Sequence, residues 1–165
     1  MTQDCIISDA TLAFIEREVA IDVASCDNEL MPSTARAYGC SVAADRRRIT
    51  LYLKRSEARQ LLHDVLVHDC IAAVFCLPAT ESALQIKGRQ IRLSVADEAG
   101  LAVVAQHGRD FVAGVLPLGH ERLFAEAYME IAPADTVALS FAPEVVFEQT
   151  PGPGAGRALP ERGAA

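Results

Sequence analysis

Apolar residues alternate with polar or small residues along most of this chain, and a period of two is the pattern of a β-strand with one buried face. The segments that show it are 19–23, 38–42, 49–53, 83–95 and 137–147. A sixth segment, 70–77, reads CIAAVFCL without a polar residue, which fits a strand covered on both faces, at the centre of a sheet or at an interface. The pattern therefore predicts about six strands.

Three segments show instead the 3.6-residue period of amphipathic helices. Each follows a residue suited to cap a helix: Ser8, Ser56 and Asp97. The residues predicted to face inward are Leu12 and Ile15 in the first helix, Leu61, Leu62, Val65 and Leu66 in the second, and Leu101, Val104, Phe111, Val112 and Val115 in the third. Gly108 and Gly114 weaken the third helix and could split it in two.

The order of these elements favours one fold class. Three strands come first, with a hairpin turn at AADRRR whose arginines are expected in water, and the longer helices are inserted only later. This order disfavours a doubly wound α/β sheet and predicts a mainly β (α+β) fold, a six-stranded antiparallel barrel with inserted helices. Residues 1–150 are expected to form this single domain. The Pro/Gly/Ala-rich residues 151–165 are expected to be a flexible C-terminal tail, or to be ordered only by a partner.

The strand at 83–95 changes phase in its middle. Its apolar residues occupy even positions up to Ile86 and odd positions from Ile91 onward, with Gly88 between the two sets. A change of phase requires a turn or an inserted residue, and we place a β-bulge at Gly88 because glycine permits one. Gln85 and Lys87 then stand together on the polar face of the strand, either beside a binding site or on a solvated corner of the barrel.

Charge and length narrow the classes of function. The 165 residues carry a net charge of −7, which argues against nucleic acid or an anionic membrane surface as a partner, because both would repel the chain. No apolar run approaches the roughly 18 residues of a membrane-spanning helix and the N-terminus lacks the features of a signal peptide, so a cytoplasmic protein is expected. The five cysteines lack metal-binding spacing, which is typical of reduced thiols.

Sequence motifs exclude several kinds of site. The chain contains no G-x-G-x-x-G, G-x-x-x-x-G-K-[ST], G-x-S-x-G or H-E-x-x-H motif, so the sites that these motifs mark are not predicted. The four histidines are scattered, and His63 and His68 are five residues apart, which does not place them on one helical face as metal ligands. No metal site is predicted, and no side chain stands out as a catalytic acid or base.

A cluster of basic and hydroxyl residues lies where the third strand meets the helix. In the stretch YLKRSEAR these residues are Lys54, Arg55, Ser56 and Arg59. The N-terminus of a helix offers unpaired N–H groups and a partial positive charge, so backbone amides, a hydroxyl and nearby cations together suit a phosphate. Ordinary capping by Ser56 and exposed cations at a loop explain the same residues without a ligand.

Five stretches of the chain carry a family resemblance. They are VAIDVASCDNELMPSTARAYGCSV, ITLYLKRSEARQLL, CIAAVFCLPAT, SALQIKGRQIRL and FAPEVVFEQTPGPGAG. In this order they resemble the pyridoxamine 5′-phosphate oxidase-like FMN-binding split barrels, and most closely the general flavin-nucleotide-binding branch. The resemblance covers about residues 10–155.

The resemblance implies a split-barrel homodimer with FMN at the subunit interface, its phosphate held by one chain and its ring partly covered by the other. By position, Lys54, Arg55, Ser56 and Arg59 match the phosphate-binding segment of the family, Gln85 matches its strand glutamine beside the flavin with Lys87 on the same face, and Arg36 lies near a further basic contact. There is one departure, because the family often opens this helix with Ser-Arg-Lys whereas this chain has Ser56-Glu57-Ala58.

Two functions follow from the resemblance. The first is an FMN-dependent oxidoreductase of pyridoxamine 5′-phosphate oxidase-like type that acts on an unknown small-molecule substrate, with hydride transfer carried out by the flavin. Pyridoxamine phosphate is not the expected substrate, because the chain lacks tryptophan and the C-terminal arginine-rich segment of the true oxidase. The alternative is a non-catalytic dimeric module that binds flavin, haem or deazaflavin (F420), or that has lost its ligand.

Overall fold

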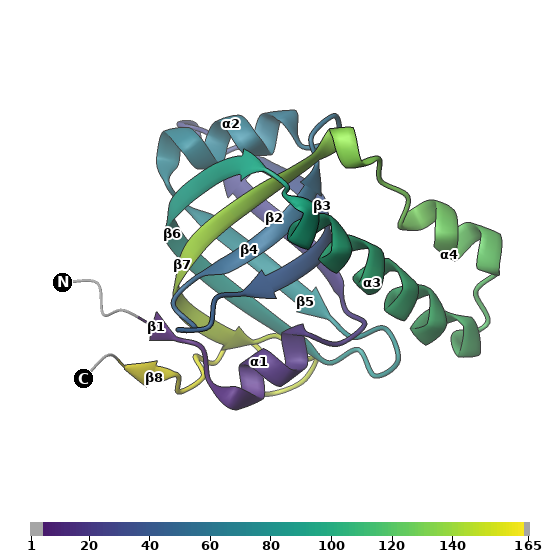
Figure 1. Cartoon of the computed structure of the whole chain (residues 1–165). Coiled ribbons are helices and arrows are strands. Elements are labelled where there is room, and N and C mark those ends of the chain that lie inside the picture. The colour runs from purple at the N-terminus through teal and green to yellow at the C-terminus, as the bar shows by residue number, and fades with distance from the viewer. Residues whose placement is uncertain (1–4, 164–165) are drawn as a thin grey trace.

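Six antiparallel strands close into a barrel, and helices lie on its outside (Figure 1). This computed structural model describes residues 5–163. The elements in chain order are β1 (Cys5–Ile6), α1 (Asp9–Ile15), β2 (Ala20–Cys26), β3 (Pro32–Val42), β4 (Ile49–Lys54), α2 (Arg59–His68), β5 (Ile71–Cys76), β6 (Ala83–Val95), α3 (Glu98–Val115), the 3₁₀ turn η1 (Leu116–Leu118), α4 (Arg122–Tyr128), the 3₁₀ turn η2 (Pro133–Asp135), β7 (Thr136–Glu148) and β8 (Arg162–Gly163). The barrel strands β2 to β7 correspond to the six predicted segments, five from the period of two and β5 from the uninterrupted apolar run, so the fold class is confirmed.

The strands follow the order β2-β3-β4-β7-β6-β5 around the barrel, and each neighbouring pair is antiparallel. The predicted turn at 43–48 joins β3 to β4, but its arginines are half-buried rather than in water. Arg46 pairs with Asp9 at 2.5 Å, and Arg48 donates to the carbonyl of Gln90 at 2.5 Å. These cations therefore tie the turn to α1 and to β6.

Alternate side chains of the strands fill the barrel interior. The largest fully buried ones on the barrel strands are Phe75, Phe141, Ile21, Ile49, Leu51, Leu53, Ile86 and Leu139. β5 is covered by its own chain on one face: Ile71, Ala73 and Phe75 are buried, whereas the outward side chains Ala72, Val74 and Cys76 are partly exposed. The uninterrupted apolar run therefore has an outer face that its own chain covers only in part.

α3 lies against the outside of the barrel beside β3 (Figure 1). Asp97 caps it as predicted, because its carboxylate accepts a hydrogen bond from the amide of Gly100 at 2.8 Å. Gly100 also permits the close approach, since a Cβ there would lie 2.5 Å from the ring of Tyr52. The helix runs unbroken through Gly108 and Gly114, so the predicted split does not occur. Tertiary packing on the barrel compensates for the weak helix propensity of glycine.

β6 changes phase as the sequence predicts, but at a different residue. The register between β6 and β7 shifts twice, and the second shift, after Arg89, gives β6 an extra residue. Gln90 adopts a left-handed φ of 57° at this point, so the bulge that changes the phase of β6 lies there. The first shift does fall between Lys87 and Gly88, as predicted, but its extra residue is Glu144 of β7. Gly88 has another role, because a Cβ on it would overlap the carbonyl oxygen of Ala142 and lie 2.5 Å from the ring of Phe141.

The described part of the C-terminal segment folds back onto the barrel. Leu159 packs against the barrel core, and the carboxylate of Glu161 accepts hydrogen bonds from the Ser8 amide at 2.5 Å and the Thr11 hydroxyl at 2.6 Å. β8 then pairs with β1. The segment thus contacts two parts of the chain: the Leu159 amide donates to the Val146 carbonyl of β7 at 2.8 Å, and Glu161 binds residues about 150 positions earlier.

Candidate functional site

The predicted phosphate cradle lies in the turn between β4 and α2. Ser56 does not cap α2, because the helix begins at Arg59 and its N-cap is Ala58, which has no capping side chain. Ser56 instead contacts Asp135, at the end of η2: its amide donates to Oδ1 at 2.9 Å and its hydroxyl donates to Oδ2 at 2.5 Å. The prediction that Ser56 caps α2 is therefore wrong, since a carboxylate distant in sequence takes both of its donors.

The cations beside Ser56 also have partners within the chain. Lys54 Nζ lies 2.9 Å from Glu57 Oε1, and the Tyr38 hydroxyl donates to the other oxygen of Glu57 at 3.1 Å. Arg55 donates through its guanidinium to the carbonyl of Ala134 at 2.7 Å. The hydrogen bond from Lys54, followed by that from Tyr38, holds the pKa of Glu57 below its usual range. Glu57 is the residue at which the chain departs from the family sequence. It pairs with Lys54, one of the residues expected to bind the phosphate.

Two further arginines complete the predicted basic set. Arg36 on β3 lies near Lys54, because its neighbour Ala37 pairs with Leu53. Its guanidinium stacks 3.4 Å from the ring centroid of Tyr128 on α4 and donates to the Tyr128 carbonyl at 3.1 Å. Arg59 is exposed at the start of α2. Arg36 therefore fixes α4 to the barrel in this structure.

Gln85 and Lys87 lie on the outer face of β6, opposite buried Leu84 and Ile86, as predicted. Their neighbours across the sheet are residues of β5 and β7, and together they form what we call the β5–β7 face: Ala72, Val74, Gln85, Lys87, Val145 and Phe147. Lys87 Nζ stands 5.4 Å from the ring centroid of Phe147. This face thus combines apolar side chains with one amide and one ammonium group.

The turn and the β5–β7 face lie at opposite ends of the barrel. Lys54 pairs with Thr136 at the start of β7, whereas Gln85 pairs with Phe147 near its end. At about 3.3 Å per residue, the eleven positions from Thr136 to Phe147 correspond to roughly 36 Å along β7. One chain therefore does not bring all the predicted site residues together.

The contacts at the turn test whether it fits the phosphate of FMN. The amide and the hydroxyl of Ser56 already bind the Asp135 carboxylate, and Lys54 is paired with Glu57. A phosphate dianion placed here would face two carboxylates at close range, which is unfavourable. The turn in this conformation therefore does not fit the phosphate group of FMN.

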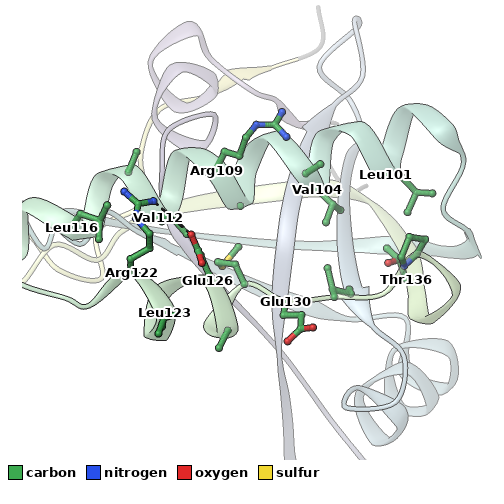
Figure 2. Close-up of a pocket in the computed structure, with 17 residues that line it drawn as sticks. Leu101, Val104, Arg109, Val112, Leu116, Arg122, Leu123, Glu126, Glu130 and Thr136 are labelled. Carbon is green, nitrogen blue, oxygen red and sulfur yellow. Dashed lines mark ion pairs between the residues drawn. The ribbon is translucent and has the colours of Figure 1, made fainter.

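A groove of about 820 Å³ opens between α3 and α4 (Figure 2). Its apolar lining includes Leu101, Val104 and Val112 of α3, and at its rim Arg122 and Glu126 of α4 form an exposed ion pair at 3.6 Å. The volume falls within the range of about 300–1,000 Å³ that is typical of small-molecule sites. Sequence analysis missed this groove because it did not predict α4, a helix of only seven residues that forms one of its walls.

The fold has known relatives, although no family model matches the chain and no curated protein matches its sequence. An F420 reductase shares 12% identity at a TM-score of 0.56, over 85% of this chain and 98% of the reductase chain. HupZ from Group A Streptococcus shares 10% identity at a TM-score of 0.55, over 92% of this chain and 100% of the HupZ chain. A Lactobacillus delbrueckii protein, provisionally assigned as a pyridoxamine 5′-phosphate oxidase, shares 11% identity at a TM-score of 0.52, over 89% of this chain and 95% of that chain.

These similarities show that the chain has the split-barrel fold of the pyridoxamine 5′-phosphate oxidase-like proteins. The resemblance drawn from the sequence is confirmed at this level. Among the described residues, no group of three or more His, Cys, Asp or Glu side chains is arranged to hold a metal ion. Within the same residues, no helix combines the length and apolar character needed to cross a membrane.

Proposed function

We propose that two copies of this chain pair through the β5–β7 face and hold the ring of a flavin or deazaflavin beside Gln85. The observation that carries the proposal is the composition of this face, which is apolar and half-exposed around two polar side chains. A partly exposed apolar face with a few polar side chains suits a surface that a ligand or a partner covers. The split-barrel fold shared with an F420 reductase supports this class of ligand.

The proposed site recognises the ring rather than the phosphate. Ala72, Val74 and Phe147 offer a flat apolar support, and the amide of Gln85 both donates and accepts hydrogen bonds, as the heteroatoms of a flavin ring require. When bound, a flavin or deazaflavin supplies hydride-transfer chemistry. The role of the chain is to bind and orient the ring. We assign no catalytic acid or base, so redox turnover would depend on the bound ring alone.

Val74→Asp tests this site directly. A carboxylate in the centre of the β5–β7 face should convert a dimer into a monomer and weaken riboflavin binding at least tenfold, because burying an unpaired charge is unfavourable. Light scattering measures the oligomeric state, and titration of riboflavin fluorescence measures binding. Riboflavin is the chosen probe because it has the ring without the phosphate, and we expect it to bind about as tightly as FMN.

Val95→Asp is the matched control for this experiment. Val95 lies at the other end of β6 with 83% of its surface exposed, so its replacement should leave both dimer and riboflavin binding unchanged. A monomeric wild-type protein, or a Val74→Asp variant that binds riboflavin like the wild type, would contradict the proposal.

The groove between α3 and α4 supports a second candidate function, the binding of an apolar or aromatic small molecule. Its apolar lining favours such a ligand, and the charges of Arg109 and Arg122 are balanced by those of Glu126 and Glu130. Ala105→Trp should fill the groove and reduce the fluorescence of the bound aromatic sulfonate dye ANS by more than half. Ala102→Trp, on the same helix at an exposed position outside the groove lining, should leave it unchanged. Equal fluorescence in both variants would show that the dye does not use the groove.

A further inference from the structure

The turn between β4 and α2 binds an anionic group of the chain itself, the carboxylate of Asp135. Each oxygen of the Asp135 carboxylate accepts one hydrogen bond from Ser56, from the amide at 2.9 Å and from the hydroxyl at 2.5 Å. The backbone of Asp135 is fixed as well, because its carbonyl accepts from the Arg55 amide at 2.8 Å. Ser56 thus binds a negatively charged group of defined position through two donors.

The charges around Asp135 reinforce this arrangement. The hydrogen bond from the Ser56 hydroxyl lowers the pKa of the Asp135 carboxyl most, and the Ser56 amide and the cations Arg55 and Lys54 lower it further. A backbone amide, a hydroxyl and two cations are also what holds a phosphate oxygen in proteins. The surroundings of this carboxylate are therefore those of a bound anionic ligand.

We infer that Asp135 takes the place of a phosphate monoester at the β4–α2 turn, so that the wild-type chain excludes phosphate there and removal of Asp135 opens the turn to it. The carboxylate uses the same Ser56 donors that a phosphate would need, and it adds a negative charge that would repel one. The second carboxylate at the turn, Glu57, has its charge balanced by Lys54 and does not contact Ser56, so it leaves these donors free when Asp135 is removed. Lys54, Arg55 and Ser56 therefore stabilise the Asp135 carboxylate, although the turn does not fit the phosphate of FMN. The inference does not depend on the proposed flavin site, which lies at the other end of the barrel.

Asp135→Ala is the variant that tests the exclusion, with inorganic phosphate as the probe. We expect calorimetric titration, at constant ionic strength maintained with chloride, to give at least tenfold tighter phosphate binding than the wild type. Adding Ser56→Ala to this variant should abolish the gain, because it removes the hydroxyl donor. Asp135→Asn removes the charge with little change in shape, so it provides the same comparison if the alanine variant does not fold, as judged by circular dichroism.

Glu121→Ala is the matched control, since it also removes one negative charge, and Glu121 makes no capping hydrogen bond at the start of α4. Its phosphate affinity should equal that of the wild type. The inference is overturned by a folded Asp135 variant with no gain in phosphate affinity, by an equal gain in Glu121→Ala, or by wild-type phosphate binding that Ser56→Ala abolishes. These outcomes are separate from the riboflavin and light-scattering results, which test the proposed function.

Discussion

Gly88→Ala is expected to lower the free energy of unfolding by about 3 kcal/mol, although it adds only one methyl group. The new Cβ would overlap the carbonyl oxygen of Ala142 and lie 2.5 Å from Cδ2 of Phe141. Neither neighbour can move easily, because the first is backbone of β7 and the second is a fully buried ring. For a chain of this size the loss corresponds to a fall of roughly 6–12 °C in the thermal midpoint, and Gly88→Val should cost more.

Gly108→Ala is the control for the same substitution at a different glycine. Gly108 lies inside α3, and the atom nearest to its added Cβ would be Met129 Cβ at 3.8 Å, an ordinary contact. Alanine favours helix over glycine by about 1 kcal/mol, so this variant should be as stable as the wild type or slightly more stable. A Gly88→Ala protein with the wild-type thermal midpoint would show that β6 and β7 do not approach as closely as we describe.

Features of this fold that depend on local signals could be predicted from the sequence. The period of two locates five of the six barrel strands and the uninterrupted apolar run locates β5, and Ser8 and Asp97 cap their helices as their positions predict. These signals succeed because a strand face or a helix cap involves residues within a few positions of one another. The phase change of β6 is an intermediate case: the pattern requires a bulge between Ile86 and Ile91, but it does not decide between Gly88 and Gln90.

Features that depend on distant partners could not be predicted in this way. Ser56 has the signals of an N-cap, yet Asp135, 79 positions later, binds it. Glu161 likewise binds Ser8 and Thr11, about 150 positions earlier in the chain. The Pro/Gly/Ala-rich composition of residues 151–165 gives no sign of this contact. A single sequence records which groups are available for hydrogen bonding, but the choice among competing partners is made by tertiary structure. For this reason the sequence pattern places Lys54 on β4 and Gln85 on β6, whereas the partners of Arg36 and Ser56 come from segments distant in the sequence.

Asp64 is the clearest example of a residue whose role depends on a partner distant in the sequence. It is a buried carboxylate on the side of α2 that faces the barrel. It accepts hydrogen bonds from the Ser33 hydroxyl of β3 at 2.6 Å and from Gln60 at 2.8 Å, and it lies 3.2 Å from Nδ1 of His63. The bond from Ser33, followed by those from His63 and Gln60, holds the pKa of Asp64 below its usual range. This carboxylate therefore joins α2 to the barrel.

Asp64→Ala should lower the thermal midpoint by roughly 5–10 °C, because it leaves the Ser33 hydroxyl without its acceptor and creates a cavity under α2. Ser33→Ala should cost less, and the double variant should cost less than the sum of the two, since both remove the same contact. Gln60→Ala serves as the control, because Gln60 is exposed and supplies only one of the hydrogen bonds. Additive effects of Ser33→Ala and Asp64→Ala would contradict this account.

The same carboxylate should give the stability of the protein a defined dependence on pH. Its pKa is lower in the folded chain than in the unfolded chain, so its stabilising effect is complete above the unfolded value of about 3.9 and is lost as the pH falls through the lower folded value. The difference in thermal midpoint between the wild type and Asp64→Asn should therefore be constant above about pH 5 and shrink below about pH 4. A difference that instead persists unchanged into acid would mean that the charge of Asp64 does not stabilise the fold, and that only the shape of its side chain holds α2 against β3.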